Sequence, residues 1–226
     1  MHAVVLADNF IGKCISLENV SEEGKGQAVA LRSEGDKSVF FLCEFRSYQD
    51  TLYVNGGRQF FRECDVYGSV DFIFGDAAMI LQKCNIYFRD FGYMTAQGRT
   101  DMARNTGISV DNCSIKAAPE FPPSAEKGFL GRPWKDFARV IVMKSFIDNV
   151  INPAGYEEWG GRSKTAQYIE YANSGPGSIT DARVKWPGFH ALKSGEGDKA
   201  KPFSVAVFID GNQWLPSTRV PFDPNV

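Results

Sequence analysis

Val39-Phe40-Phe41-Leu42-Cys43-Glu44-Phe45 decides the fold, because the same pattern returns further along the chain. It recurs as Phe60-Phe61-Arg62-Glu63-Cys64-Asp65-Val66 and as Ile80-Leu81-Gln82-Lys83-Cys84-Asn85-Ile86, so the cysteine recurs after 21 and then 20 residues. A repeat of this length is typical of a solenoid, in which each repeat forms one coil that is buried by its neighbours. The pattern therefore predicts a stack of coils.

The cysteines extend this pattern in both directions. Cys14 and Cys113 fit the same phrase, and Ser145 takes the cysteine position in a later copy. The four intervals between cysteines are 29, 21, 20 and 29 residues, so we expect the longer coils to carry loops. We interpret the cysteines as a ladder of small buried side chains, since free Cys packs well inside proteins. A disulfide between stacked neighbours such as Cys43 and Cys64 is the alternative, and the sequence does not decide between them.

Four polar residues also keep the period. Gln27 precedes Gln49 by 22 residues, and Asp50 precedes Asp71 by 21. Equivalent positions in adjacent coils lie about one strand spacing apart, roughly 4.8 Å. The period therefore predicts two neighbouring carboxylates beside two amides, an arrangement that suits acid–base or nucleophilic catalysis. A structural ladder of amides and carboxylates is the alternative interpretation.

Composition limits the classes of protein to consider. A chain of 226 residues with 43% hydrophobic content predicts one domain over residues 1–226. The net charge of −2 argues against a nucleic-acid partner, and no apolar run reaches the ~20 residues of a membrane span. The N-terminus lacks the basic start and long apolar stretch of a signal peptide. No CxxC or Cys/His spacing indicates zinc, and we predict no metal or cofactor.

Alternating apolar and polar residues predict mostly strands. The predicted strand regions are 3–17, 27–32, 39–45, 59–66, 78–87, 107–115, 139–147 and 203–209. Residues 117–131 and 188–202 are predicted loops, and Trp214 is expected to begin an extended tail. Coils of parallel strands with right-handed crossovers predict an all-β fold, a single-stranded right-handed parallel β-helix with external loops.

Four segments resemble the motifs of one enzyme family. They are Gln27-Ala28-Val29-Ala30-Leu31-Arg32, Tyr48-Gln49-Asp50-Thr51-Leu52-Tyr53, Val70-Asp71-Phe72-Ile73-Phe74-Gly75 and Leu130-Gly131-Arg132-Pro133-Trp134. Together they closely resemble the catalytic region of the plant-type pectin methylesterases, or pectinesterases. Further matches follow in the family's order, and the resemblance covers nearly the whole chain. It implies a right-handed parallel β-helix with a cleft on one face, in agreement with the repeat.

The resemblance also implies a role for each polar residue. Asp71 matches the nucleophile that attacks the C6 methyl ester of a galacturonate unit, and Arg132 matches the residue that pairs with it. Asp50 matches the acid that protonates departing methanol and then activates water. Proximity to Asp71 favours the protonated form of Asp50. Gln27 and Gln49 match the amides that stabilise the oxyanion.

Aromatic side chains complete the expected groove. By resemblance, the residues expected to bind substrate are Gln27, Arg132, Trp134, Phe74 and Trp159. Tyr48 and Phe72 are weaker candidates. Trp159 and the phenylalanines are equally open to interpretation as core aromatics.

The resemblance further implies where the protein acts and what it binds. The implied substrate is methyl-esterified pectin (homogalacturonan), the implied location is the cell wall after secretion, and a proteinaceous pectinesterase inhibitor is a candidate partner. We expect a monomer. Two alternatives stay open: a weakly active or inactive chain that retains pectin binding, and another pectin-acting β-helix enzyme. A lyase or polygalacturonase would need a calcium–carboxylate cluster or a different Asp set, which the motifs do not supply.

Departures from the family lead to further expectations. The chain lacks the family's region before Ala3, so the first coil is expected to expose Val4, Val5 and Phe10. His2 and His190 are expected to be ordinary surface residues. Two glycosylation sequons begin at Asn19 and Asn112; Asn112 is expected inside a strand, which makes Asn19 the better acceptor.

Overall fold

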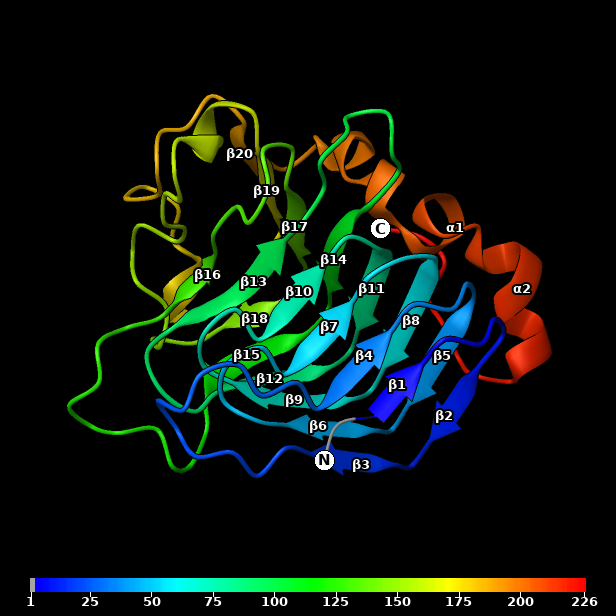
Figure 1. Ribbon diagram of the computed structural model, residues 1–226. Coiled ribbons are helices and arrows are strands. Elements are labelled where there is room, and N and C mark those ends of the chain that lie inside the picture. Colours follow the sequence, from blue (N-terminus) through cyan, green and yellow to red (C-terminus); the bar gives the residue numbers. More distant parts are fainter. Residues whose placement is uncertain (1–2) are drawn as a thin grey trace.

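The computed structural model describes residues 3–226, so His2 lies outside the described part. Three parallel sheets run along a stack of coils (Figure 1). Sheet A contains β1 (Ala3–Val5), β4 (Leu31–Ser33), β7 (Leu52–Val54), β10 (Ile73–Gly75), β13 (Tyr93–Gln97) and β16 (Phe129–Gly131). Sheet B contains β2 (Ile11–Lys13), β5 (Ser38–Phe41), β8 (Arg58–Arg62), β11 (Ala78–Gln82), β14 (Gly107–Asp111), β17 (Arg139–Met143), β19 (Gln167–Tyr171) and β20 (Phe189–Leu192). Sheet C contains β3 (Ser16–Glu18), β6 (Glu44–Arg46), β9 (Asp65–Gly68), β12 (Asn85–Phe88), β15 (Ser114–Ala117) and β18 (Phe146–Ile147). The predicted parallel β-helix is confirmed.

Each coil turns a sharp corner between sheet B and sheet C. The residue before each cysteine position has a positive φ, as in Leu42 (53°), Glu63 (52°) and Lys83 (55°). This left-handed conformation is costly for residues other than glycine, so the surrounding ladder of hydrogen bonds must hold it. The predicted strands 39–45, 59–66, 78–87, 107–115 and 139–147 are therefore each two strands in different sheets, not one. The alternation of apolar residues continues through the corner and hides it.

The interior is a stack of aromatic and aliphatic side chains. The rings of Phe40 and Phe61 lie face to face with centroids 4.8 Å apart, and Phe45 meets Phe61 edge-on at 5.8 Å. Phe61 and Phe45 are fully buried. Burying one such side chain contributes roughly 1.5–3 kcal/mol, so the repeat stabilises each coil through the next.

The cysteine ladder has the predicted form. The backbone N–H of Cys64 donates to Sγ of Cys84 at 3.4 Å, and that of Cys84 donates to Sγ of Cys113 at 3.4 Å. The backbone N–H of Cys113 then donates to Oγ of Ser145 at 3.0 Å, so the serine continues the ladder. All five thiols are free, so the disulfide alternative is not realised. Cys14, in the first coil, is exposed.

The C-terminal segment differs from the prediction. The expected strand 203–209 and extended tail form the helices α1 (Val205–Phe208) and α2 (Gly211–Thr218). They cover the outward-facing side chains of sheet B (Figure 1), because Val39, Phe60 and Ile80 are apolar and pack against this segment. The segment is thus selected by burial rather than by an alternating pattern. The predicted loop 188–202 likewise contains β20 and two short 3₁₀ turns, Gly197–Lys199 and Lys201–Phe203.

The first coil has a coil on one side only. Strands β1, β2 and β3 each lie at the end of their sheet. Val4 is 49% exposed, as expected, whereas Val5 and Phe10 are partly buried against the core. Phe10 achieves this by packing its ring against Phe40, with centroids 5.5 Å apart.

Candidate active site

The polar residues singled out from the sequence meet at the start of the sheet A strands. Gln49 and Asp50 directly precede Thr51 and β7, and Asp71 precedes β10 by one residue. A cavity of about 250 Å³ forms over them. Its lining consists of Gln27, Gln49, Asp50, Asp71, Phe74, Ala96, Arg132, Trp134 and Trp159. All eight side chains predicted for the site from the sequence are therefore brought together.

An extra residue in the first of these coils aligns the two glutamines. Leu31 pairs with Leu52 across sheet A, yet the backbone N–H of Ala28 donates to the carbonyl of Gln49. Both Ala30 and Leu31 donate to the carbonyl of Thr51, at 2.8 and 3.2 Å, which marks a bulge of one residue. The bulge explains why the glutamines are 22 residues apart and the aspartates 21. It places Gln27 beside Gln49.

The two aspartates occupy equivalent turns of adjacent coils. Both are in the left-handed conformation, with φ of 64° for Asp50 and 52° for Asp71, which Asp tolerates better than most residues. The backbone N–H of Asp50 donates to the carbonyl of Val70 at 2.9 Å, so the turns stack in register. Each carboxyl group is only 7% exposed as a residue. The stack therefore holds two nearly buried carboxyl groups next to each other.

Arg132 distinguishes the two carboxyl groups. Its Nε donates to Oδ1 of Asp71 at 2.9 Å and its Nη2 to Oδ2 at 2.8 Å, a bidentate pair. Its guanidinium also lies 3.8 Å from the ring centroid of Tyr93 and 4.1 Å from that of Trp159. The phenol of Tyr93 donates to the carboxylate of Glu157. Two aromatic faces thus hold the cation that aims Asp71.

The protonation of the pair follows from this asymmetry. Burial raises the pKa of Asp50 to about 7, and the nearby Asp71 raises it further against the opposing effects of Gln49 and Arg132. Burial also raises the pKa of Asp71, but the hydrogen bonds and charge of Arg132 oppose that rise. The sequence prediction included only the lowering effect of Arg132 and omitted burial. Asp50, without an ion pair among the described residues, is the better proton carrier.

The chain matches the family model described as Pectinesterase over residues 2–212. It belongs to the pectinesterase family. It is 52% identical to Pectinesterase 2 of Citrus sinensis over 226 residues, which is 96% of this chain and 44% of that protein. The chain spans less than half the length of the curated relatives that it matches most strongly.

Two solved pectin methylesterases have the same fold. The carrot enzyme superimposes with a TM-score of 0.95 at 42% identity, covering 99% of this chain and 72% of that one. The Aspergillus niger enzyme superimposes with a TM-score of 0.83 at 36% identity, covering 94% and 67%. Family membership and the parallel β-helix therefore rest on both sequence and structure.

Aromatic side chains flank the site of this pectinesterase-family chain on the outer face of sheet A. Phe74 stacks on Tyr53, with centroids 4.5 Å apart and an interplanar angle of 1°. Trp134 meets Phe74 edge-on at 6.0 Å. The ring of Trp134 lies against Gly98, where a Cβ atom would come within 2.8 Å of it. This glycine is what lets the indole lie flat on the floor of the cleft.

Two of the weaker candidates lie elsewhere. Phe72 is fully buried and packs edge-on against Phe88, so its prediction as a groove residue is wrong. Tyr48 is not in the cavity lining; its ring lies 3.8 Å from the guanidinium of Arg89. Phe72 follows Asp71 in the sequence, and strand alternation sends it to the opposite face.

Sequence reasoning missed two aromatic neighbours of the site, Tyr53 and Tyr93. Tyr53 pairs with Phe74 across β7 and β10, at the 21-residue period, so the repeat contained that signal. Tyr93 reaches Arg132 through the insertion between β15 and β16, whose course no local pattern reveals.

Other searches of the described residues bear on the expected partners. Residues 3–226 contain no group of three or more His, Cys, Asp or Glu side chains arranged to hold a metal ion. No helix within the same residues is long and apolar enough to cross a membrane. Of the two sequons, Asn112 lies at an exposed corner with φ of 54°, not within a strand as predicted. Asn19 uses its side-chain N–H to bind the carbonyl of Val29 at 3.1 Å.

Proposed function

We propose that this chain hydrolyses the C6 methyl esters of galacturonate units in pectin and releases methanol. The observation that carries this proposal is the asymmetry of the carboxyl pair. Asp71 is aimed and charge-stabilised by Arg132, whereas the buried Asp50 has a pKa raised to about 7. One group is prepared to act as a nucleophile and the other to carry a proton.

In the first step, a carboxylate oxygen of Asp71 attacks the ester carbonyl carbon. The carbonyl oxygen gains negative charge, and the side-chain N–H groups of Gln27 and Gln49 donate to it. One such donor is worth roughly 3–4 kcal/mol of barrier in other enzymes. When the tetrahedral intermediate collapses, protonated Asp50 gives its proton to the methoxide. Methanol leaves, and an anhydride between Asp71 and the sugar carboxyl group remains.

In the second step, ionised Asp50 takes a proton from water as the water attacks the sugar carbonyl of the anhydride. The bond to Asp71 breaks, which frees its carboxylate and releases a galacturonate carboxylic acid. Asp50 is again protonated, so the cycle closes. Arg132 stays paired with Asp71 throughout and stabilises it both as nucleophile and as leaving group.

The aromatic residues provide for the sugar rings. Phe74, Trp134 and Trp159 line the cavity beside the carboxyl pair and offer apolar surface, which suits the C–H faces of a pyranose. We assign them, with Gln27 and Arg132, to substrate binding. Because pectin is a cell-wall polymer, we further propose that the protein acts there after secretion. Relatives of this chain carry the name pectinesterase/pectinesterase inhibitor, which supports a proteinaceous inhibitor as a partner.

Methanol release tests this proposal directly. The chain is incubated with highly methyl-esterified pectin, and methanol is measured together with the acid that appears. Equal amounts of methanol and acid support the proposal, and polygalacturonate without methyl esters is the blank. Binding to esterified pectin without methanol release would contradict the proposal and favour a pectin-binding protein.

A further inference from the structure

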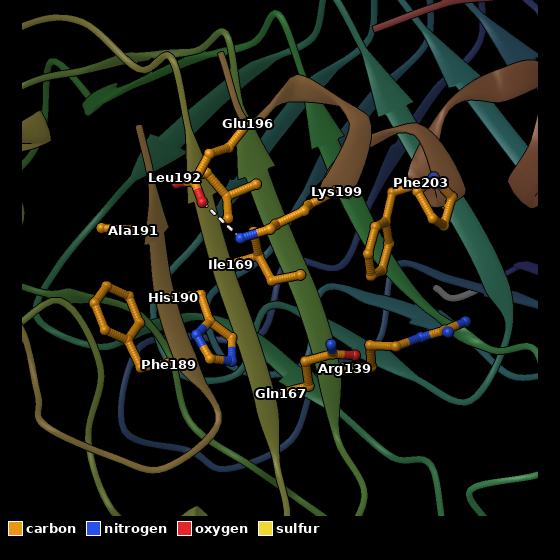
Figure 2. Close-up of a pocket in the computed structure, with 11 residues that line it drawn as sticks. Arg139, Gln167, Ile169, Phe189, His190, Ala191, Leu192, Glu196, Lys199 and Phe203 are labelled. Atoms are coloured by element: carbon orange, nitrogen blue, oxygen red, sulfur yellow. Dashed lines mark hydrogen bonds and ion pairs between the residues drawn. The ribbon is translucent and has the colours of Figure 1, made fainter. Parts of the chain in front are cut away.

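The largest cavity listed for the described residues is not the candidate active site. It has a volume of about 730 Å³, within the range of ligand pockets, and lies on the outer face of sheet B over β17, β19 and β20 (Figure 2). It shares no lining residue with the cavity around Asp50 and Asp71. The C-terminal 3₁₀ turns form its opposite wall through Lys199 and Phe203.

Arg139 is a cation without a carboxylate partner at one end of this cavity. Its Nε donates to the carbonyl of Thr106 at 2.9 Å and its Nη2 to Oδ1 of Asn105 at 2.8 Å. It forms no ion pair within residues 3–226, and its guanidinium lies 5.1 Å from the ring centroid of Phe203. Burial and the nearby Arg99 lower the pKa of Arg139 to about 10, so it keeps its charge at neutral pH. A partly buried charge without a counter-charge is costly, and a bound anion would offset that cost.

Two polar side chains near Arg139 are also uncommitted. Gln167 pairs with Arg139 across β17 and β19, and His190 pairs with Ile169 across β19 and β20. Figure 2 shows the three polar side chains around the same part of the cavity, with Arg139 next to Gln167. Neither the Gln167 amide nor the His190 ring has a hydrogen-bond partner in the described part of the chain. Both groups are therefore available to hydroxyl groups of a ligand.

The rest of the cavity combines apolar surface with a second cation. Ile169, Leu192 and Phe203 form its apolar lining. At the far end Lys199 pairs with Glu196, the only acidic residue in the lining (Figure 2). Charge complementarity therefore favours an anionic ligand, and the apolar patches suit the faces of sugar rings.

We propose that this cavity is a second saccharide-binding site, which takes carboxylate-bearing galacturonate units outside the catalytic cleft. The sugar carboxylate would bind Arg139, and its hydroxyl groups would bind Gln167 and His190. The identity of the sugar rests on the proposed function, because ester hydrolysis converts neutral units into carboxylates. The site would then select product stretches of the same polymer and keep the enzyme on its substrate.

Calorimetric titration with unesterified trigalacturonate tests this site without turnover. Trigalacturonate also resembles the product in the cleft, so Trp134→Ala serves as the background in which cleft binding is weakened. Binding should persist in that background and fall about tenfold or more when Gln167→Glu and His190→Glu are added, because charge repulsion replaces hydrogen bonding. Lys185→Glu, an exposed change outside the cavity, alters the net charge as much as the pair does and should leave affinity unchanged.

The outcomes separate this proposal from the proposed function. A chain that binds trigalacturonate at this site but releases no methanol would retain the second site and lose the esterase. Equal affinity with and without the two substitutions would overturn the second site, as would equal binding of a neutral galactose trimer. Thermal melting of each variant establishes that a loss of binding does not come from unfolding.

Discussion

Arg132 binds Asp71 through both carboxylate oxygens, at 2.9 and 2.8 Å, while the adjacent Asp50 has no ion pair within residues 3–226. The two aspartates come from equivalent turns of neighbouring coils, have equal exposure and share the left-handed conformation. Their different chemistry therefore comes from one guanidinium supplied by a distant strand. The following predictions test how that difference works.

Asp71→Asn should reduce methanol release by about 10³-fold or more, because an amide oxygen is a poor nucleophile. The change is nearly isosteric, so pectin binding and the melting temperature should change little. Asp181→Asn, on the surface, is the matched control and should keep full activity. If Asp71→Asn retained more than a few per cent of the activity, Asp71 would not be the nucleophile.

Asp50→Asn should reduce turnover by about 10²- to 10⁴-fold, because Asn can neither protonate methoxide nor deprotonate water. In the unchanged chain, the first step requires protonated Asp50. Its pKa of about 7 means that this form is lost as the pH rises through 7. Single-turnover methanol release should therefore decline on the alkaline side, with an apparent pKa that belongs to the pair. A flat profile across this range would rule out Asp50 as the acid.

The same raised pKa predicts a pH effect on stability. The folded pKa of Asp50 lies above its unfolded value of about 3.9, so the folded state binds this proton more tightly. The resulting contribution is fully present below the unfolded pKa and is lost as the pH rises through about 7. Relative to Asp50→Asn, the unchanged chain should thus lose melting temperature between pH 5 and pH 8. Parallel melting curves for the two proteins would contradict the assignment.

Tyr93→Leu should lower kcat, because it removes one of the two aromatic faces that hold Arg132. A cation–π contact is worth about 0.5–2 kcal/mol, which corresponds to roughly a twofold to thirtyfold loss. Tyr93→Phe keeps the face and loses only the hydrogen bond to Glu157, so it should retain most of the activity. Equal losses in the two variants would show that the hydrogen bond, and not the stacking, positions Arg132.

The bulge at Ala30 gives a sharper test of the oxyanion site. Deleting Ala30 would restore a 21-residue spacing and align Gln27 with Tyr48 in place of Gln49. We expect the deletion to cost as much activity as Gln27→Ala, about 10²- to 10³-fold for one lost donor. Combining the two changes should add little further loss. A deletion variant that melts normally and stays fully active would show that the glutamine alignment is unimportant.

The repeat made much of this architecture predictable from the sequence. The phrase around Cys43, Cys64 and Cys84 specified the stack, and the periods of the Gln and Asp residues specified their meeting. The corners were not predictable, because left-handed residues such as Leu42 and Lys83 carry no glycine signal. Their conformation is imposed by the neighbouring coils.

The C-terminal helices escaped prediction for a related reason. Residues 203–209 are apolar enough for a strand, and Pro216 argues against a helix, yet the segment is helical where it covers sheet B. Tertiary burial of Val39, Phe60 and Ile80 outweighed local propensity. The role of Arg132, by contrast, came from the family resemblance, since no period connects it with Asp71.

The first coil should open more readily than the middle of the stack. Strands β1, β2 and β3 have a neighbour on one side only, and Val4 is 49% exposed. Coils of a solenoid are stabilised mainly by their neighbours, so the end coil has the lowest local opening energy. In the chain of residues 1–226, amide hydrogen exchange should be faster in residues 3–18 than in residues 73–88. Phe10→Ala should speed exchange in 3–18 further, because it removes the ring contact with Phe40, and should leave 73–88 unchanged. Equal protection in the two regions would mean that the first coil is as stable as the interior of the stack.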